Sequence, residues 1–189
     1  MNRQNIIQAL INKINAKSYL EIGLGVGHVF RGIKCDKKYG VDPQFNNYVY
    51  ERGTKCDIEP THKMTSDEFF EQNLEKFDVI FIDGMHEATY TERDINNAVK
   101  CLSDGGYIVP RVHDIWNGDC WKAWVKIRAS NPNLNMYVID HDHGCGVIQK
   151  GSQEVLDLKG QEITYTNLDN NRKEWLNLIS LEEFFKYET

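Results

Sequence analysis

The sequence predicts an α/β fold, a doubly wound and mostly parallel sheet with helices on both faces and one reversed strand near its edge. Short apolar runs alternate along the chain with stretches of helical periodicity, a pattern typical of parallel sheets. The run "FDVIFIDG" at 77–84 has the continuous apolar character of a strand buried on both faces. Later, two apolar runs are joined only by "HDHG" at 141–144, which is too short for a crossover helix and therefore predicts an antiparallel hairpin.

Six short apolar runs, each bounded by glycine or polar residues, are the expected strands. In chain order they lie at 18–23, 37–42, 77–84, 105–109, 135–140 and 144–151. The last two form the hairpin, so one strand near the edge of the sheet is expected to be reversed.

Five stretches are the expected helices. The N-terminal stretch has apolar residues on one face, and the stretch after residue 64 opens with a Ser/Thr-x-x-Glu capping signal. A later one ends at a pair of glycines, which commonly stop a helix. The expected ranges are 1–17, 65–77, 91–106, 118–130 and 170–187, the last packing back on the core.

Length and composition indicate one ordinary globular domain over 1–189. The chain is 41% hydrophobic and 26% charged, and its net charge of −6 argues against a general nucleic-acid binder. Its five cysteines include no CxxC pair, which is typical of free thiols in a reducing compartment. No signal peptide and no apolar run of about 20 residues is present, so we expect a cytoplasmic protein without a membrane partner.

Three alternating glycines follow the first expected strand, in "YLEIGLGVGHVF" at 19–30. Glycines at such a strand end permit a sharp turn and let a ligand approach the backbone. Asp42 closes the second expected strand, where a carboxylate can accept hydrogen bonds from ribose hydroxyls. A nucleoside-containing ligand is therefore expected. The dinucleotide pattern G-x-G-x-x-G would need a third glycine at position 28, which is His28.

The loop "EIGLGVG" resembles motif I of the class I S-adenosylmethionine-dependent methyltransferases, and Asp42 in "YGVDP" resembles the acidic residue that follows it. The expected hairpin is also what the reversed seventh strand of that family would produce. The resemblance implies a Rossmann-like seven-stranded sheet and S-adenosyl-L-methionine as cofactor. The residues that it assigns to cofactor binding here are Glu21, Gly23, Gly25, Gly27 and Asp42.

Further runs, "FIDGMHE" and "RDI" among them, resemble small class I methyltransferases found beside glycosyltransferase and other carbohydrate genes. The similarity extends from Tyr19 to about Gln153. It implies that Met64, Thr65 and Ser66 line the adenine side, and that Asp83, Gly84 and His86 face the methyl group and the acceptor.

One segment departs from this pattern. In relatives, the strand that corresponds to 105–109 usually continues into a His-Asp pair and a loop before "PR…WNGD" is reached. Here Val109 runs directly into "PRVHDIWNGD". His113-Asp114 resembles part of the downstream segment. Either the segment is deleted at Val109-Pro110 or a loop is missing from the chain, and we favour the missing loop because the flanking motifs persist.

Methyl transfer to a hydroxyl needs an aligned acceptor and a group that takes its proton. His86 is the first candidate for that base, with hydrogen bonding to Asp83 or helix capping as the structural alternative. Asp83 is expected to contact the ligand. It could also hold Mg²⁺, which we do not favour, and no metal site is predicted. "HDHGC" at 141–145 is interpreted as a turn, and Trp121 and Trp124 as core residues.

Together these observations predict O-methylation of a small hydroxylated acceptor, a sugar or glycan-linked intermediate by the resemblance. A non-catalytic S-adenosylmethionine- or nucleotide-binding domain is the alternative, and a nicotinamide oxidoreductase is a more distant one. A homodimer is left open. Trp116 is a weaker candidate for acceptor contact.

Overall fold

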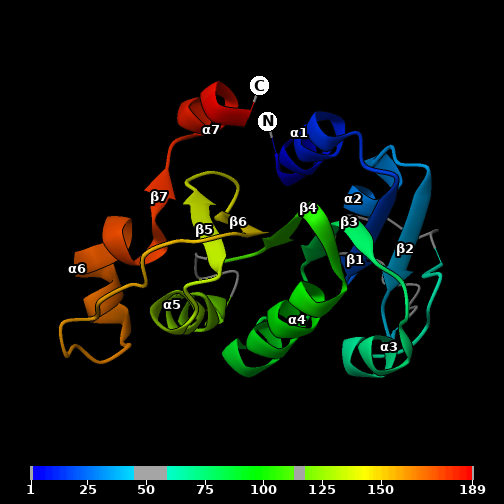
Figure 1. The fold of residues 1–189 in the computed structure, drawn as a ribbon. Coiled ribbons are helices and arrows are strands. Elements are labelled where there is room, and N and C mark those ends of the chain that lie inside the picture. The colour runs from blue at the N-terminus through cyan, green and yellow to red at the C-terminus, as the bar shows by residue number, and fades with distance from the viewer. Residues whose placement is uncertain (1, 45–58, 113–117, 189) are drawn as a thin grey trace.

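The computed structural model describes residues 2–44, 59–112 and 118–188, and the predicted roles of His113, Asp114 and Trp116 lie outside these ranges. A seven-stranded sheet with strand order β2-β1-β3-β4-β6-β5-β7 forms the centre (Figure 1). Its strands are β1 (Ser18–Ile22), β2 (Lys37–Val41), β3 (Phe77–Ile82), β4 (Leu102–Pro110), β5 (Leu134–Ile139), β6 (Cys145–Lys150) and β7 (Leu178–Ile179).

The predicted fold class is confirmed. Strands β2, β1, β3 and β4 pair in parallel, whereas β6 pairs antiparallel with both β4 and β5. The hairpin turn lies at 140–144 with left-handed backbone at Asp142 and His143, which confirms that "HDHGC" is turn rather than extended strand. β6 is the one reversed strand among the seven described.

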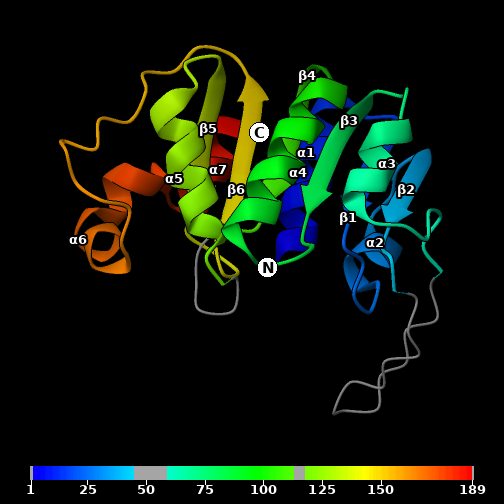
Figure 2. The ribbon, with the colours of Figure 1, turned by 90° about the horizontal axis from the view of Figure 1, so that it is seen from below.

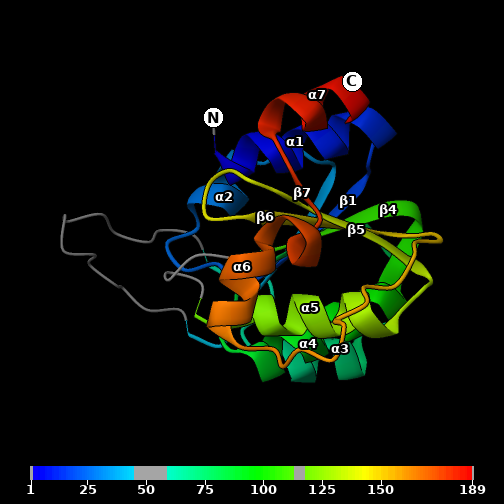
Figure 3. The same cartoon turned by 90° about the vertical axis from the view of Figure 1, so that its left-hand side faces the viewer.

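Helices cover both faces of the sheet (Figure 3). α1 (Arg3–Ile14), α2 (His28–Gly32) and α7 (Leu181–Glu188) lie on one side, while α3 (Ser66–Gln72), α4 (Ala88–Cys101) and α5 (Cys120–Ser130) lie side by side on the other (Figure 2). The core is divided accordingly. Leu20 and Ile22 of β1 belong to the cluster beneath α4 and α5, whereas Tyr19 belongs to the cluster beneath α1.

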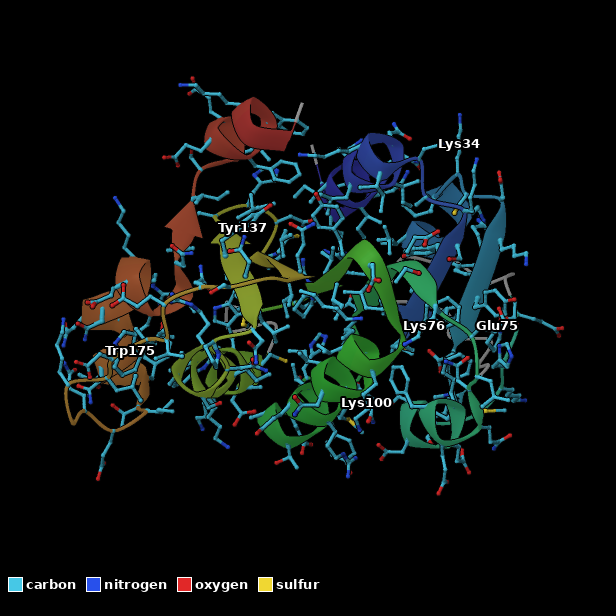
Figure 4. The ribbon with its side chains drawn as sticks, viewed as in Figure 1. Lys34, Glu75, Lys76, Lys100, Tyr137 and Trp175 are labelled. Atoms are coloured by element: carbon cyan, nitrogen blue, oxygen red, sulfur yellow. The ribbon has the colours of Figure 1, made fainter. Side chains whose placement is uncertain are left out.

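The structure corrects the C-terminal helix predicted at 170–187. α6 (Tyr165–Leu176) ends where Asn177 adopts left-handed backbone, β7 then pairs in parallel with β5, and α7 follows. Arg128 of α5 fixes the end of α6 by donating to the carbonyl of Trp175 at 2.9 Å. Trp175, labelled in Figure 4, is fully buried.

The other predicted helices are shorter than expected. α1 ends at Ile14 because Asn15 adopts left-handed backbone. α3 begins with the predicted capping box, formed by Thr65 and Glu68, but ends at Gln72. α4 starts at Ala88 and gives way at Leu102 to β4, which begins three residues before the expected strand and contains a register irregularity. Trp121 and Trp124 are buried core residues, as predicted.

β4 runs without interruption through Val109 and Pro110, which pair with Phe81 and Ile82 of β3. Arg111 follows directly and bridges to Cys145 of β6. The residue that leaves the fourth strand is therefore a buried arginine. None of the helices in the described ranges is long and apolar enough to cross a membrane.

Candidate functional site

A cleft of about 680 Å³ opens at the carboxyl ends of β1, β2 and β3. This is the edge at which open α/β sheets bind ligands, and the volume lies in the range of small-molecule sites. Of the predicted cofactor residues, Gly23, Gly25, Asp42, Thr65, Ser66 and Asp83 line it. The other lining residues are Ile22, Val41, Pro43, Gln44, Asp67, Gly84, Met85, Tyr90, Arg93 and Asp94.

The first two positions of the loop require glycine for different structural reasons. Gly23 has φ +81°, and a Cβ there would lie 2.4 Å from the carbonyl oxygen of Asp83, so only glycine fits between β1 and β3. Gly25, with φ +52°, has open space where its Cβ would be. Its bare backbone therefore faces the cleft, as a ligand lying over the loop would require.

Glu21 and Gly27 are not among the residues that line the cleft. Glu21 is 1% exposed and accepts a 2.5 Å hydrogen bond from the hydroxyl of Tyr19. Burial raises the pKa of Glu21 to about 8, although Tyr19, Lys38 and the amide of Phe30 act in the opposite direction. Glu21 thus holds the start of α2, and Gly27 is the residue that precedes this helix.

Asp42 ties the loop to β2. Its Oδ2 accepts from the amides of Leu24 at 2.9 Å and Gly25 at 3.3 Å, and its Oδ1 accepts from Gln44 at 2.9 Å. The carboxylate therefore lies at the cleft, and it fixes the backbone of the glycine loop from the end of β2.

The opposite wall is built by α3 and α4. Thr65 caps α3, Ser66 lines the cleft, and Met64 packs against the core instead of lining it. Asp94 of α4 is 3% exposed, and burial raises its pKa to about 6 despite a hydrogen bond from Ser66. Asp94 was not predicted as a site residue. The run "RDI", which contains it, was the available signal.

Two more wall residues form a stacked pair. The Arg93 guanidinium lies 4.6 Å from the ring centre of Tyr90 and forms a 2.7 Å ion pair with Asp67. Spacing on a helix could have indicated Tyr90 and Arg93 as neighbours, but not that they face this cleft.

The two predicted catalytic residues lie together beside the cleft. His86 Nε2 is 3.0 Å from Asp83 Oδ1. Asp83 also lies 3.8 Å from the Nε atoms of Arg3 and of Arg111, and its side chain is 20% exposed. Arg3 and Arg111 were not predicted, because they come from α1 and from the end of β4.

The segment "WNGD" reaches this edge through its last two residues. Asp119 Oδ1 accepts from the amide of Ala88 at 2.6 Å and so caps α4 from a distant part of the chain. A Cβ at Gly118 would lie 2.0 Å from the carbonyl oxygen of His86, so the backbones pack directly together. The position of His86 thus depends on residues 118–119.

Among the residues that the structure describes, no group of three or more His, Cys, Asp or Glu side chains is arranged to hold a metal ion. Asp83, the carboxylate that we considered for Mg²⁺, is flanked by two guanidiniums. These cations would repel a divalent ion at the same carboxylate.

A family model described as a methyltransferase domain matches residues 20–115, just over half of the chain, and the chain belongs to this family. Its fold is that of class I methyltransferases.

Three solved structures illustrate that fold. A protein assigned as a caffeoyl-CoA O-methyltransferase from Staphylococcus aureus has 20% identity and a TM-score of 0.58, covering 78% of this chain and 82% of its own. TomG from Streptomyces achromogenes, an O-methyltransferase of tomaymycin synthesis solved with S-adenosylmethionine, has 12% identity, a TM-score of 0.55 and coverages of 79% and 80%. An O-methyltransferase from Bacillus cereus in complex with S-adenosylhomocysteine has 15% identity, a TM-score of 0.53 and coverages of 80% and 80%. A search among curated proteins found no significant match.

Proposed function

We propose that this chain binds S-adenosylmethionine in the cleft at the carboxyl ends of β1, β2 and β3 and transfers its methyl group to a hydroxyl of a small acceptor. The observation that carries the proposal is the combination of a bare Gly25 backbone, the Asp42 carboxylate and an open volume large enough for a nucleoside ligand. The family match supports it, and ligands in solved structures of the same fold agree with it.

Charge favours this ligand over a dinucleotide. Among the described lining residues, four are carboxylates, Asp42, Asp67, Asp83 and Asp94, and one is an arginine, Arg93, which is paired with Asp67. Asp83 is in addition flanked by Arg3 and Arg111, whereas Asp42 and Asp94 have no such guanidinium in the described ion pairs. A pyrophosphate would be repelled by this lining, whereas the sulfonium and ammonium groups of S-adenosylmethionine would be attracted. The nicotinamide oxidoreductase reading is correspondingly disfavoured.

Bound S-adenosylmethionine supplies an electrophilic methyl group for in-line displacement. Gly23 and Gly25 would let its amino-acid part lie along the loop, and Asp42 would accept from its ribose. Ser66, next to Thr65 at the start of α3, would face the adenine side. Asp83 holds the His86 ring at 3.0 Å, and His86 would take the proton of the acceptor hydroxyl as the methyl group is transferred.

The acceptor is proposed to be a sugar or a glycan-linked intermediate. The support is the similarity of "FIDGMHE" and "RDI" to small methyltransferases found beside carbohydrate genes. The acceptor would lie beside Asp83 and His86. A small polar substrate could lose the proton of its hydroxyl to the His86 ring there.

Two measurements test the proposal. Calorimetric titration with S-adenosylmethionine, S-adenosylhomocysteine and NAD should show binding of the first two alone. Incubation with labelled methyl donor and a panel of monosaccharides, nucleotide sugars and catechols should then give labelled ether products from the sugars. Lack of heat with both adenosyl ligands would reject the site, and binding without transfer to any acceptor would favour the non-catalytic alternative.

A further inference from the structure

Asp83 lies between two guanidinium groups from distant parts of the chain. Arg3, at the start of α1, has its Nε 3.8 Å from Asp83 Oδ2, and Arg111, just after β4, has its Nε 3.8 Å from Asp83 Oδ1. Each arginine thus faces a different oxygen of the carboxylate that also contacts His86.

Both Nε atoms are buried and lack a hydrogen-bond partner among the described residues. The Arg111 side chain is only 4% exposed, so its charge is far less screened than that of a surface arginine. A buried guanidinium needs a compensating anion and hydrogen-bond acceptors. Asp83 is the carboxylate that the Nε atoms of Arg3 and Arg111 share.

The hairpin turn holds both arginines in place. Asp142 accepts from the amide of Arg3 at 2.5 Å and from its Nη1 at 3.1 Å, and the carbonyl of Asp142 accepts from Nη1 of Arg111. Burial alone would raise the pKa of Asp142, but the Arg3 amide and the charges of Arg3 and Arg111 lower it overall. Asp142 also has left-handed backbone, φ +48°, which places it in this turn.

We propose that Arg3 and Arg111 are positioning residues for methyl transfer: with Asp142 they form a clamp that fixes Asp83, and through Asp83 they orient the His86 ring. This inference rests on the proposed function and deepens it. The clamp supplies two positive charges at the carboxylate, so transfer proceeds without a divalent cation.

The clamp also joins the N-terminal helix to the catalytic edge. α1 is joined to the catalytic edge by the Arg3–Asp142 contacts across 139 residues of sequence. A purely structural role would predict that loss of the Arg3 charge lowers stability while leaving the His86 ring unchanged. The clamp predicts a change at the ring itself.

The test follows the His86 ring by NMR of side-chain-labelled histidines, with His86→Gln to assign its signals. Arg3→Gln removes the charge while keeping a polar chain of similar reach, and Arg3→Lys keeps the charge. Arg172→Gln is the matched control, because the contacts of Arg172 with Asp169 at 3.0 Å and with the Tyr165 hydroxyl at 3.4 Å lie within α6. Chemical shifts are recorded at fixed pH, with S-adenosylhomocysteine affinity measured in parallel.

We expect Arg3→Gln to move the His86 signals toward those of a protonated ring, because an unbalanced Asp83 attracts the proton. Arg3→Lys should restore them in large part, and Arg172→Gln should not move them. With an acceptor in hand, kcat should fall roughly tenfold in Arg3→Gln while S-adenosylhomocysteine affinity stays within about twofold. Chelator should leave the wild-type kcat unchanged.

Unchanged His86 signals in a folded Arg3→Gln protein would overturn the clamp, as would loss of activity on chelation. Arg111→Gln should move the His86 signals in the same direction as Arg3→Gln. If Arg111→Gln fails to fold, Asp142→Asn replaces it, since that change removes the carboxylate that accepts from Arg3 and that attracts the charges of both arginines. The NMR outcome does not depend on the methyl donor. If the wild type binds no adenosyl ligand but Arg3→Gln shows the predicted His86 shifts, the proposed function is rejected and the clamp is retained.

Discussion

The two ends of β3 carry an aspartate each, and the two carboxylates have different roles. Asp78, the second residue of the strand, accepts from the amides of Lys17 at 2.8 Å and Ser18 at 3.1 Å. Asp83, just past the other end, faces two guanidiniums and the ring of His86. One aspartate closes backbone hydrogen bonds, and the other lines the cleft.

The surroundings of the two ends explain the difference. At the amino end, ion pairs such as that of Lys17 with Asp36 are exposed, and such pairs contribute little. Lys76 and Lys100, labelled in Figure 4, meet there through a side chain and a carbonyl. At the carboxyl end, Glu21, Asp94 and Arg111 are all buried. Of the four buried carboxyl and guanidinium side chains in the described ranges, three lie at this edge and only Arg128 lies elsewhere, a distribution typical of a functional site.

The largest effect is expected when each of the two aspartates is replaced by asparagine. Asp83→Asn removes the charge that orients His86, so kcat should fall roughly 10³-fold, within the range attributed to general-base catalysis. Labelled methyl transfer measures it. S-adenosylmethionine affinity by calorimetry should change much less.

Asp78→Asn is the control at the amino end. It should lower the midpoint of urea unfolding, because it weakens acceptors for two amides, while kcat remains as in the wild type. Equal losses of kcat in both variants would remove the distinction between the two ends.

The second-largest effect compares two glycines, Gly23 at the carboxyl edge of the sheet and Gly105 near its amino edge. Gly23→Ala would place a Cβ 2.4 Å from the Asp83 carbonyl in left-handed backbone and should cost about 3 kcal/mol of unfolding free energy and abolish S-adenosylmethionine binding. Gly105→Ala has φ +74° but open space, so it should cost only about 1 kcal/mol and leave binding intact. Chemical unfolding and calorimetry measure both. Binding by a folded Gly23→Ala protein would contradict the role of the loop.

Much of this edge could be predicted from the sequence, since it depends on local patterns. The buried apolar runs gave β1, β2 and β3 nearly to the residue, and glycine spacing gave the loop. The Ser/Thr-x-x-Glu signal gave the start of α3, because a capping box is formed within four residues.

Other parts depend on contacts that no local pattern contains. β7 has two residues, too few for a periodicity, and it forms only because β5 offers an edge. Arg3 and Arg111 reach Asp83 from separate elements, and Asp94 becomes a cleft residue only when α4 packs on the sheet. Glu21 was predicted as a cofactor residue from its motif, whereas its contacts are with Tyr19 and the start of α2.

The third effect is a difference in pH dependence between Glu21 and Asp78. Burial raises the pKa of Glu21 from 4.5 to about 8, so its contribution to stability is full below pH 4.5 and is lost as pH rises to about 8. For Asp78, burial raises the pKa, but the hydrogen bonds from Lys17, Ser103 and Ser18 lower it overall, so its contribution is lost as pH falls.

Glu21→Gln should therefore stabilise the protein above pH 8, by about 2 kcal/mol, because a neutral amide no longer has to be buried as an anion. Below pH 4.5 the variant and the wild type should unfold at similar urea concentrations. Urea unfolding from pH 4 to 9 measures the difference. Parallel curves for the two proteins over the whole range would show that Glu21 is as easily ionised as a surface glutamate.

The smallest effect concerns Asp94, which shares burial with Glu21 but lines the cleft. Because burial raises its pKa to about 6, it acquires its negative charge as pH rises through that value. A cationic ligand should then bind more tightly, so the affinity for S-adenosylmethionine should increase about fivefold between pH 5 and 7. Asp94→Asn should remove most of that increase while binding at pH 5 stays nearly unchanged. Asp67→Asn is the control, since Asp67 is about half exposed and paired with Arg93, and its loss should leave the pH profile in place. If both variants keep the wild-type profile, the charge of the cleft is set elsewhere, and Asp94 serves only to hold Ser66 at the start of α3.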